Sequence, residues 1–326
     1  MMRSVNGSGR RRCMQLIKAD RARFIRRSLR KYWSLYLLLI PVVAWFITFC
    51  YYPMYGVVIG FKDYYAKLGI LGSPWAEQNG LEHFIWLFST ADFSRALKNT
   101  VVISVLKLIF CFPVPIVMSL MLNEIRAKNL KKGIQTAIYL PFFISWVVIS
   151  GIVYDIFAVN GGIVNNIRMA LGMERISYMT TSRYFYLILI LTEIIKGSGW
   201  GTVIYIAGIS GIDPNLYEAA EIDGAGRFRK MSSITLPCIS PIIVTMFTLQ
   251  VGNILNAGFD PIFNLYNTSV YDVADILDTY AYRLGISQGY VERATALGLF
   301  KALINFVLLL GSNKIVKFIS GQGLYE

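Results

Sequence analysis

Long apolar segments alternate with shorter polar ones along this chain, and the pattern predicts a polytopic membrane protein. A helix that crosses a bilayer needs about 20 mostly apolar residues. Six segments meet that requirement, at residues 35–58, 100–122, 136–158, 184–208, 241–258 and 294–312. The predicted fold class is therefore all-α, with about six transmembrane helices.

Two of the six segments carry local irregularities. Span two contains Pro113 and Pro115, which are expected to break or bend it because proline cannot donate a helical hydrogen bond. Span five is the least hydrophobic, because Gln250, Asn253 and Asn256 interrupt it. Their spacing is roughly helical, so we expect them to share one face of that span.

Composition supports a membrane protein without a soluble domain. Hydrophobic residues make up 55% of the 326 residues and charged residues 16%, whereas soluble domains usually have about a quarter charged residues. We divide the chain into a basic N-terminal arm at 1–34, a transmembrane region at 35–312 and a tail at 313–326. A short interfacial helix is expected at 21–30, within the arm.

The distribution of Lys and Arg predicts the orientation. Residues 1–31 contain eleven of them and one acid, Asp20, and the segments on that side of the membrane hold 20 against nine on the other. The positive-inside rule places both termini in the cytoplasm. The net charge of +13 is then explained by attraction to anionic membrane lipid rather than to nucleic acid. No cleaved signal peptide is predicted.

Metal and nucleotide chemistry are not expected in this chain. The four cysteines have no metal-site spacing, and His83 is the single histidine. No GxxxxGK[ST] motif is present, so the chain carries no P-loop. We therefore predict neither a metal site nor a bound cofactor.

A polar segment at residues 211–240 separates spans four and five and has the signals of a helical hairpin. Asp213-Pro214 is a favourable helix start, since Asp caps free N–H groups and Pro fits the first turn. Gly224 permits a sharp reversal. A second short helix is expected over 226–234, ending before Pro237.

The first helix of this hairpin has a composition suited to docking. Ala219 and Ala220 are small enough to let a helix sit deep in a groove of a partner, and Glu218 is placed to pair with a partner Arg. The alternative is an ordinary amphipathic surface loop without a partner. The combined spacing of Glu-Ala-Ala, Asp-Gly-Ala and Leu-Pro favours docking.

With these motifs the chain resembles the permeases of type I ABC importers, and in particular the branch that takes up oligosaccharides and polysaccharides. The segment 211–240 is similar to their cytoplasmic coupling loop, or EAA loop. The further matching segments are Tyr52-Pro53-Met54-Tyr55-Gly56, Phe61-Lys62-Asp63, Leu106 to Phe110, Gly199 to Thr202, Asn264 to Asn267 and Ala274 to Tyr280. Within the branch, permeases for alginate oligosaccharides are the specific candidate. Met231 departs from the aromatic residue that the family often has there.

The resemblance implies a MetI-like fold, a bacterial inner-membrane location and transport by alternating access. It implies four kinds of partner: a second permease subunit, an ABC ATPase dimer, an extracytoplasmic solute-binding protein and an oligosaccharide substrate. ATP and Mg would be bound by the ATPase and not by this chain. The residues expected to couple to the ATPase are Glu218, Ala219, Ala220, Asp223, Gly224, Ala225, Leu236 and Pro237.

Polar residues inside predicted spans are candidates for the solute path, because charge in a bilayer is costly. Lys196 follows Glu193 by three residues on the same face of span four. It is either a counter-charge for an acidic sugar or part of an internal ion pair with Glu193. Lys107 is expected to be a structural group, snorkelling or paired, and Lys301 to reach an interface.

The remaining path candidates are amides and aromatic rings. Gln250, Asn253 and Asn256 are expected either to hydrogen-bond sugar hydroxyls or to link helices, which contributes about 1 kcal/mol each. Trp200 and Phe259 are the candidate rings for stacking on sugar. Glycines near Trp200, at 197, 199 and 201, are expected to permit close helix packing.

Two other functions compete with an ATP-driven importer. A proton-coupled secondary transporter would use Glu193 as a proton carrier, but it leaves the hairpin motif unexplained. An intramembrane enzyme is disfavoured, because the spans lack histidine and paired catalytic carboxylates. We therefore expect a pore-forming subunit and no enzymatic activity in this chain.

Overall fold

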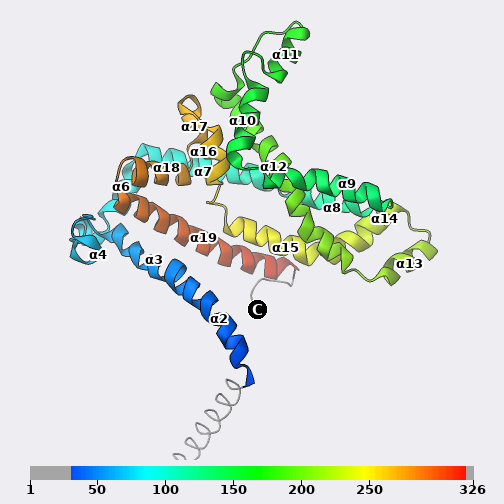
Figure 1. The fold of residues 1–326 in the computed structure, drawn as a ribbon, viewed down its shortest axis with the longest axis horizontal. Helices are drawn as coiled ribbons and strands as arrows, with labels where there is room; N and C mark the ends of the chain where they lie inside the picture. Colours follow the sequence, from blue (N-terminus) through cyan, green and yellow to red (C-terminus); the bar gives the residue numbers. More distant parts are fainter. Residues whose placement is uncertain (1–30, 321–326) are drawn as a thin grey trace, which may run out of the picture. The chain divides into compact units, whose positions relative to one another are not determined.

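A computed structural model describes residues 31–320, which form helices joined by loops (Figure 1). Within that range the sole β-type contact is an isolated bridge between Lys62 and Trp75. The predicted all-α class is confirmed. The interfacial helix expected at 21–30 lies outside the described residues. The described residues divide into two units, with the division between Val58 and Ile59.

The first unit contains α2 (Trp33–Phe46), a π-helical turn (Ile47–Tyr51) and α3 (Tyr52–Met54). None of the residues of these three elements is buried. The amide of Tyr52 donates to the carbonyl of Ile47, five residues back, and Pro53 follows directly. The wider π turn therefore stands where the missing N–H of proline would otherwise interrupt the helix.

The second unit holds the other helices. Its α-helices are α4 (Gly69–Gly72), α5 (Glu77–Gly80), α6 (Glu82–Ser89), α7 (Ala91–Phe110), α8 (Pro113–Asn123), α9 (Lys128–Tyr139), α10 (Trp146–Phe157), α11 (Ile163–Ala170), α12 (Ser182–Ser210), α13 (Pro214–Ile222), α14 (Arg227–Lys230), α15 (Leu236–Gly252), α16 (Phe259–Leu265), α17 (Tyr271–Ala274), α18 (Leu277–Tyr282) and α19 (Val291–Ser320). Its 3-10 and π turns are η3 (Leu140–Phe143), η4 (Tyr178–Thr180), η5 (Met231–Thr235), η6 (Thr268–Val270) and η7 (Arg283–Ser287), and η2 (Tyr55–Phe61) crosses the division.

Five described helices are long and apolar enough to cross a membrane, and a bent pair makes a possible sixth. The five are Trp33–Phe61, Ala91–Asn123, Ser182–Ser210, Arg227–Gly252 and Val291–Phe318. The bent pair, Lys128–Phe143 and Trp146–Phe157, turns by 100°. The third span, predicted over 136–158, is therefore not one continuous helix. The chain is extended at Ile144 and Ser145, and the Ser145 hydroxyl accepts the amide of Val148 to start α10.

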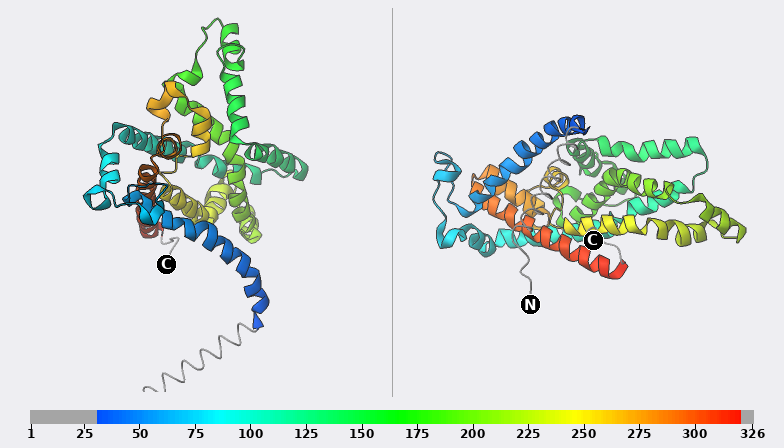
Figure 2. Two further views of the ribbon diagram at one scale, coloured as in Figure 1. Left: turned by 60° about the vertical axis from the view of Figure 1, so that its left-hand side comes forward. Right: turned by 90° about the horizontal axis from the view of Figure 1, so that it is seen from below.

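Helices α8 and α9 both pack on α12, while α15 packs on α19 (Figure 1). The irregularity predicted in span two is confirmed, since α7 ends at Phe110 and α8 begins at Pro113 within the single span Ala91–Asn123. Helix α19 continues to Ser320, so the predicted boundary of the tail at 313 falls inside a helix. Helices α10 and α11 extend away from the layer formed by α8, α9 and α12 (Figure 2).

Buried side chains form three clusters in the second unit. The largest joins α7, α10, α12 and α16 around residues such as Ile103, Leu189 and Ile262. Another joins α6, α7, α18 and α19 around Leu87 and Leu297, and a third joins α8, α12 and α15. The long helices are thereby fixed to one another at both ends of α12.

Candidate functional site

The predicted coupling loop is a helical hairpin. Helix α13 starts at Pro214, and the Asp213 carboxylate accepts the amide of Asn215 at 3.0 Å, as predicted for an N-cap. Glu218 and Ala219 are exposed on this helix, and Ala220 is half-buried. The small residues are therefore partly open to a partner, and their role in coupling stays a prediction.

Gly224 makes the turn of the hairpin. Its φ is +73°, a left-handed conformation that disfavours residues with a side chain. A Cβ added there would meet nothing within 4 Å, so the dihedral angle and not lack of space selects glycine. The amide of Gly224 donates to Glu221 and that of Ala225 to Ala220, at 3.0 and 2.8 Å. These bonds close α13.

An ion pair and a hydroxyl bridge join the two arms of the hairpin. Lys230 Nζ lies 2.5 Å from Glu221 Oε1, and this bond lowers the pKa of the Glu221 carboxyl below its usual 4.5. Tyr217 and Thr235 share a hydrogen bond of 2.8 Å between their hydroxyl groups. The hairpin is thus held in one shape by its own side chains.

The second arm does not end before Pro237, so the short helix predicted over 226–234 is wrong. Helix α14, the π turn η5 and α15 form one helix over Arg227–Gly252. The amide of Leu236 donates to Met231, five residues back, and Pro237 follows. The π turn accommodates the proline here in the same way as before Pro53. Leu236 and Pro237 are both exposed.

Apolar side chains that the sequence reasoning did not select project from this hairpin. Ile222 is 88% exposed and Phe228 83% exposed. Phe228 and Met231 line a groove of about 300 Å³ together with Met121 and Glu124 at the end of α8. The sequence did contain a signal for them, because large apolar residues in a polar loop are candidates for a protein–protein interface.

A second polar site lies where α15 ends. Lys107 on α7 pairs with Glu193 on α12, and its Nζ also lies 2.6 Å from the carbonyl oxygen of Ala257. The side chains of Lys107 and Glu193 are 11% and 20% exposed. Between the end of α15 and the start of α16 the chain is not helical, and we call this segment the polar break. Gly258 has φ +98°, a left-handed conformation that lets the backbone turn into α16 beside Lys107. Lys107 is paired, as expected, and the alternative Glu193–Lys196 pair is wrong.

The predicted amide row is divided by the end of α15. Gln250 is in the helix, but α15 ends at Gly252, so Asn253 and Asn256 are not on span five as predicted. Asn253 caps the helix end, and Asn256 Nδ2 donates to Asn253 Oδ1 at 2.9 Å. All three amides still line one small cavity of about 10 Å³, with Lys107 and Ser104. The three amides are therefore close together, as predicted, but the end of the helix and not a shared helix face brings them there.

Two further features border the break. The Ser104 hydroxyl is buried and has no hydrogen-bond partner among the described protein atoms. Asn256 also lines a larger cavity of about 270 Å³ with the ion pair of Lys301 and Asp278. Lys301 is therefore paired and does not simply reach an interface, because α18 places Asp278 against α19.

Lys196 holds the bend between α9 and α10. Its Nζ donates to the carbonyl oxygens of Pro141, Phe142 and Ile144, and it lies over the rings of Phe142 and Trp146. A cation is favourable at the carbonyl end of a helix. Its ammonium has three N–H donors, so all are engaged here. A role as counter-charge for an acidic sugar stays a prediction.

The aromatic candidates contact other rings. Trp200, 47% exposed, stacks on Phe142 at 4.7 Å. Phe259 begins α16 and stacks on Phe263 at 4.8 Å. Close packing is confirmed at Gly199 and Gly201, where an added Cβ would lie 1.8 Å from Ile138 O and 2.9 Å from the Pro115 ring. Gly197 has nothing within 4 Å, so packing does not explain it.

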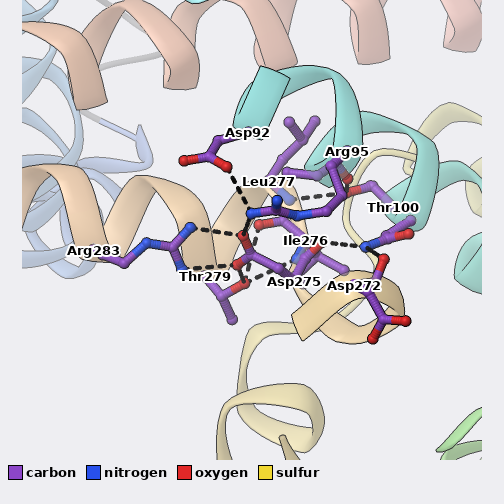
Figure 3. A network of polar contacts seen from close by, with 11 residues as sticks. Asp92, Arg95, Thr100, Asp272, Asp275, Ile276, Leu277, Thr279 and Arg283 are labelled. Carbon is purple, nitrogen blue, oxygen red and sulfur yellow. Dashed lines mark hydrogen bonds and ion pairs between the residues drawn. The ribbon is translucent and has the colours of Figure 1, made fainter. Parts of the chain in front are cut away.

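A buried carboxylate that the sequence reasoning did not single out anchors the segment that follows α16 (Figure 3). Asp275 is fully buried, and Arg283 binds both its oxygens at 3.0 and 2.6 Å. Arg95 on α7 lies 3.8 Å away, and Asn99 donates to the Asp275 carbonyl at 3.0 Å. Hydrogen bonding to Asp275 raises the pKa of Arg283. The network fixes α17 and α18 to α7.

Comparison with known proteins places these features in a family. The sequence model described as "Binding-protein-dependent transport system inner membrane component" matches residues 105–319. The polygalacturonan/rhamnogalacturonan transport system permease protein YteP of Bacillus subtilis (strain 168) is 43% identical over 291 residues, covering 89% of this chain and 90% of that protein. A chain of a bacterial ABC transporter that imports the acidic polysaccharide alginate is 38% identical with a TM-score of 0.83, covering 91% of this chain and 99% of that one. A second structure of a bacterial alginate ABC transporter, bound to an alginate pentasaccharide-bound periplasmic protein, is 38% identical with a TM-score of 0.82 and the same coverages.

Proposed function

Since the chain belongs to the family of binding-protein-dependent transport system inner membrane components, we propose that it is one of two permease subunits of an importer for acidic oligosaccharides. It is an inner-membrane permease of a sugar importer of the ABC class, with the MetI-like fold, and the family consists of permeases rather than enzymes. The proposal adds the acidic solute, the partner subunits and the orientation, with both termini in the cytoplasm.

The coupling hairpin carries the proposed link to ATP hydrolysis. We assign Glu218, Ala219, Ala220, Gly224 and the flanking Asp223, Ala225, Leu236 and Pro237 to docking on an ATPase dimer, which would bind ATP and Mg. A rigid hairpin favours this role, because the Glu221–Lys230 pair and the Tyr217–Thr235 bond resist deformation on docking. ATP-driven closure would then move the hairpin as a rigid body and produce alternating access.

The polar break at the end of α15 is the proposed solute contact. Gln250, Asn253, Asn256 and the unpaired Ser104 hydroxyl line one cavity, and amide and hydroxyl groups are suited to sugar hydroxyls. Non-helical backbone at the depth of a membrane is tolerated only where it is buried in protein or lines a water-filled path. Trp200, Phe259, Glu193 and Lys196 complete the proposed path.

The acidic nature of the solute rests on the relatives. Two of them, each aligned with about nine-tenths of the chain, are named for polygalacturonan/rhamnogalacturonan and for alginate, which are uronate-containing polymers. The periplasmic protein bound in a related structure supports an extracytoplasmic solute-binding partner for this chain. A proton-coupled secondary transporter is not supported by this family membership.

The experiment that tests the proposal is purification of the tagged chain from its native membrane in mild detergent, followed by mass spectrometry of what stays bound. An ATPase and a second permease should be recovered from wild type. The ATPase should be lost in Glu218→Lys and in Gly224→Val, while Gly197→Ala on α12 serves as the matched control. Reconstituted with a co-purified binding protein, the complex should import tetragalacturonate or an alginate tetrasaccharide when ATP is supplied. A chain recovered alone and transporting without ATP would refute the proposal.

A further inference from the structure

The external segment that follows the polar break carries a continuous row of aromatic rings. Phe259 and Phe263 lie four residues apart on α16, and Tyr266 follows three residues later as the residue that caps the helix, so the three positions share one side. The opposite side, with Pro261, Ile262 and Leu265, is buried in the core. Phe259 and Phe263 therefore lie on the side of α16 that faces away from the core, while Tyr266 at the end of the row is partly buried against it.

Tyr282 from α18 joins this row. Its ring centroid lies 5.5 Å from that of Phe259 and 5.1 Å from that of Phe263. Phe263 contacts Tyr266 at 5.9 Å, and Tyr266 stacks on Tyr271 at 5.0 Å. We call these five residues the aromatic strip. Phe263 is 36% exposed and Tyr282 38% exposed, so the strip presents open ring surface.

Polar groups flank the strip on the same exposed side of α16. Asp260 and Asn264 occupy the positions next to Phe259 and Phe263, and Asn264 Nδ2 donates to the carbonyl of Asp260 at 2.8 Å. Flat apolar rings beside carboxylate and amide groups match a pyranose ring, which has an apolar C–H face and a hydroxyl edge. An exposed carboxylate makes lipid chains a poor occupant.

The strip is connected to the site already described. Asn256 lies three residues before Phe259 and lines both cavities at the end of α15. From Phe259 to Tyr266 the helix rises by about 10 Å, enough for about two sugar rings in file. The Asp275 network fixes α17 and α18 to α7 (Figure 3), and α18 carries Tyr282 of the strip.

Resting on the proposed function, we propose that the aromatic strip is a binding surface on which successive sugar rings of the transported oligosaccharide stack on their way to the polar break. The strip recognises the apolar face of the ring and not its charge. Its removal should therefore weaken transport of tetragalacturonate and of an alginate tetrasaccharide to a similar extent.

The test uses the complete transporter with its binding protein in proteoliposomes and these two tetrasaccharides as probes. Phe263→Ala should raise the transport KM about three- to tenfold, the range of a single aromatic contact, with little change in kcat. Phe263→Trp should restore the wild-type KM, since it returns a ring. Phe306→Ala, which removes a ring 58% exposed on α19 outside the strip, should leave the KM unchanged.

The outcomes separate this proposal from the function on which it rests. A wild-type complex that transports neither probe overturns the proposed function and, with it, the strip. Wild-type transport with an unchanged KM in Phe263→Ala overturns the strip alone. So does loss of the second permease from purified Phe263→Ala complexes, because the ring would then be part of a subunit interface.

Discussion

The contact between α9 and α12 is close enough to give a sharp prediction from one methyl group. At Gly199 an added Cβ would lie 1.8 Å from the carbonyl oxygen of Ile138, whereas ordinary contact begins at 3.4 Å. Gly199→Ala therefore requires the two backbones to separate by about 1.6 Å. Overpacking of this kind costs about 1–3 kcal/mol. The backbone that must move leads directly into the bend held by Lys196.

Gly197→Ala is the matched control, since it lies on the same helix with nothing within 4 Å of the added Cβ. Both variants gain the same helix propensity, so the difference between them isolates the steric cost. Thermal unfolding of the purified complex in detergent should give a Tm for Gly199→Ala about 3–8 °C below that of Gly197→Ala. Equal melting temperatures would refute the reasoning, because they would mean that α9 and α12 are not in backbone contact at this point.

Four further predictions concern charges and the coupling turn. Glu193→Gln, which leaves Lys107 without its carboxylate, should cost about 3 kcal/mol of unfolding free energy, and a double replacement by Leu and Met should recover part of it in the same melting assay. Asp275→Asn should cost about 3–5 kcal/mol, because it leaves Arg283 without its buried partner, and a change below about 1 kcal/mol (about 3 °C) would contradict this. Gly224→Ala should lower transport-coupled ATPase activity while co-purification of the ATPase weakens, since the left-handed turn costs about 1 kcal/mol with a side chain. Glu221→Gln should lower the Tm at neutral pH, because the ionised carboxylate stabilises the hairpin through Lys230. The difference in Tm from wild type should disappear as the pH falls through the lowered pKa of Glu221, since the carboxyl is then protonated in both states. A difference in Tm that persists well below pH 4.5 would count against the ion pair.

The elements predicted well from sequence are those whose cause is local. Hydrophobic length identified α12 within two residues at either end, and Pro113 correctly marked the break between α7 and α8. The cap at Asp213 and the reversal at Gly224 followed from the chemistry of single residues. These signals need no knowledge of the partner helix.

The errors arise where the cause is a distant contact. The 100° bend in the third span depends on Lys196, which reaches the carbonyls of Pro141 and Phe142 from another helix. The end of α15 depends on Lys107 and its contact with Ala257. Sequence spacing indicated a Glu193–Lys196 pair because both lie on one helix, and tertiary packing chose Lys107 instead.

The importance of Asp275 could have been suspected from the sequence but not established. Arg283 follows it by eight residues, a spacing that puts both near one side of a helical segment, but four other acidic residues share the same predicted loop. Only the fold shows that this carboxylate is the fully buried one. The helix end predicted before Pro237 was likewise wrong, because the preceding π turn keeps that helix continuous.

The unbroken helix over Arg227–Gly252 has a mechanical consequence. Its 26 residues form a rod about 39 Å long, with the coupling hairpin at one end and Asn253 at the other. A tilt of only about 5° about one end displaces the opposite end by about 3.4 Å, which is about the diameter of one atom. A helix interrupted before Pro237 would lose this leverage at the joint. The π turn therefore lets a small change of angle at the hairpin end displace the groups around Asn253 at the other end.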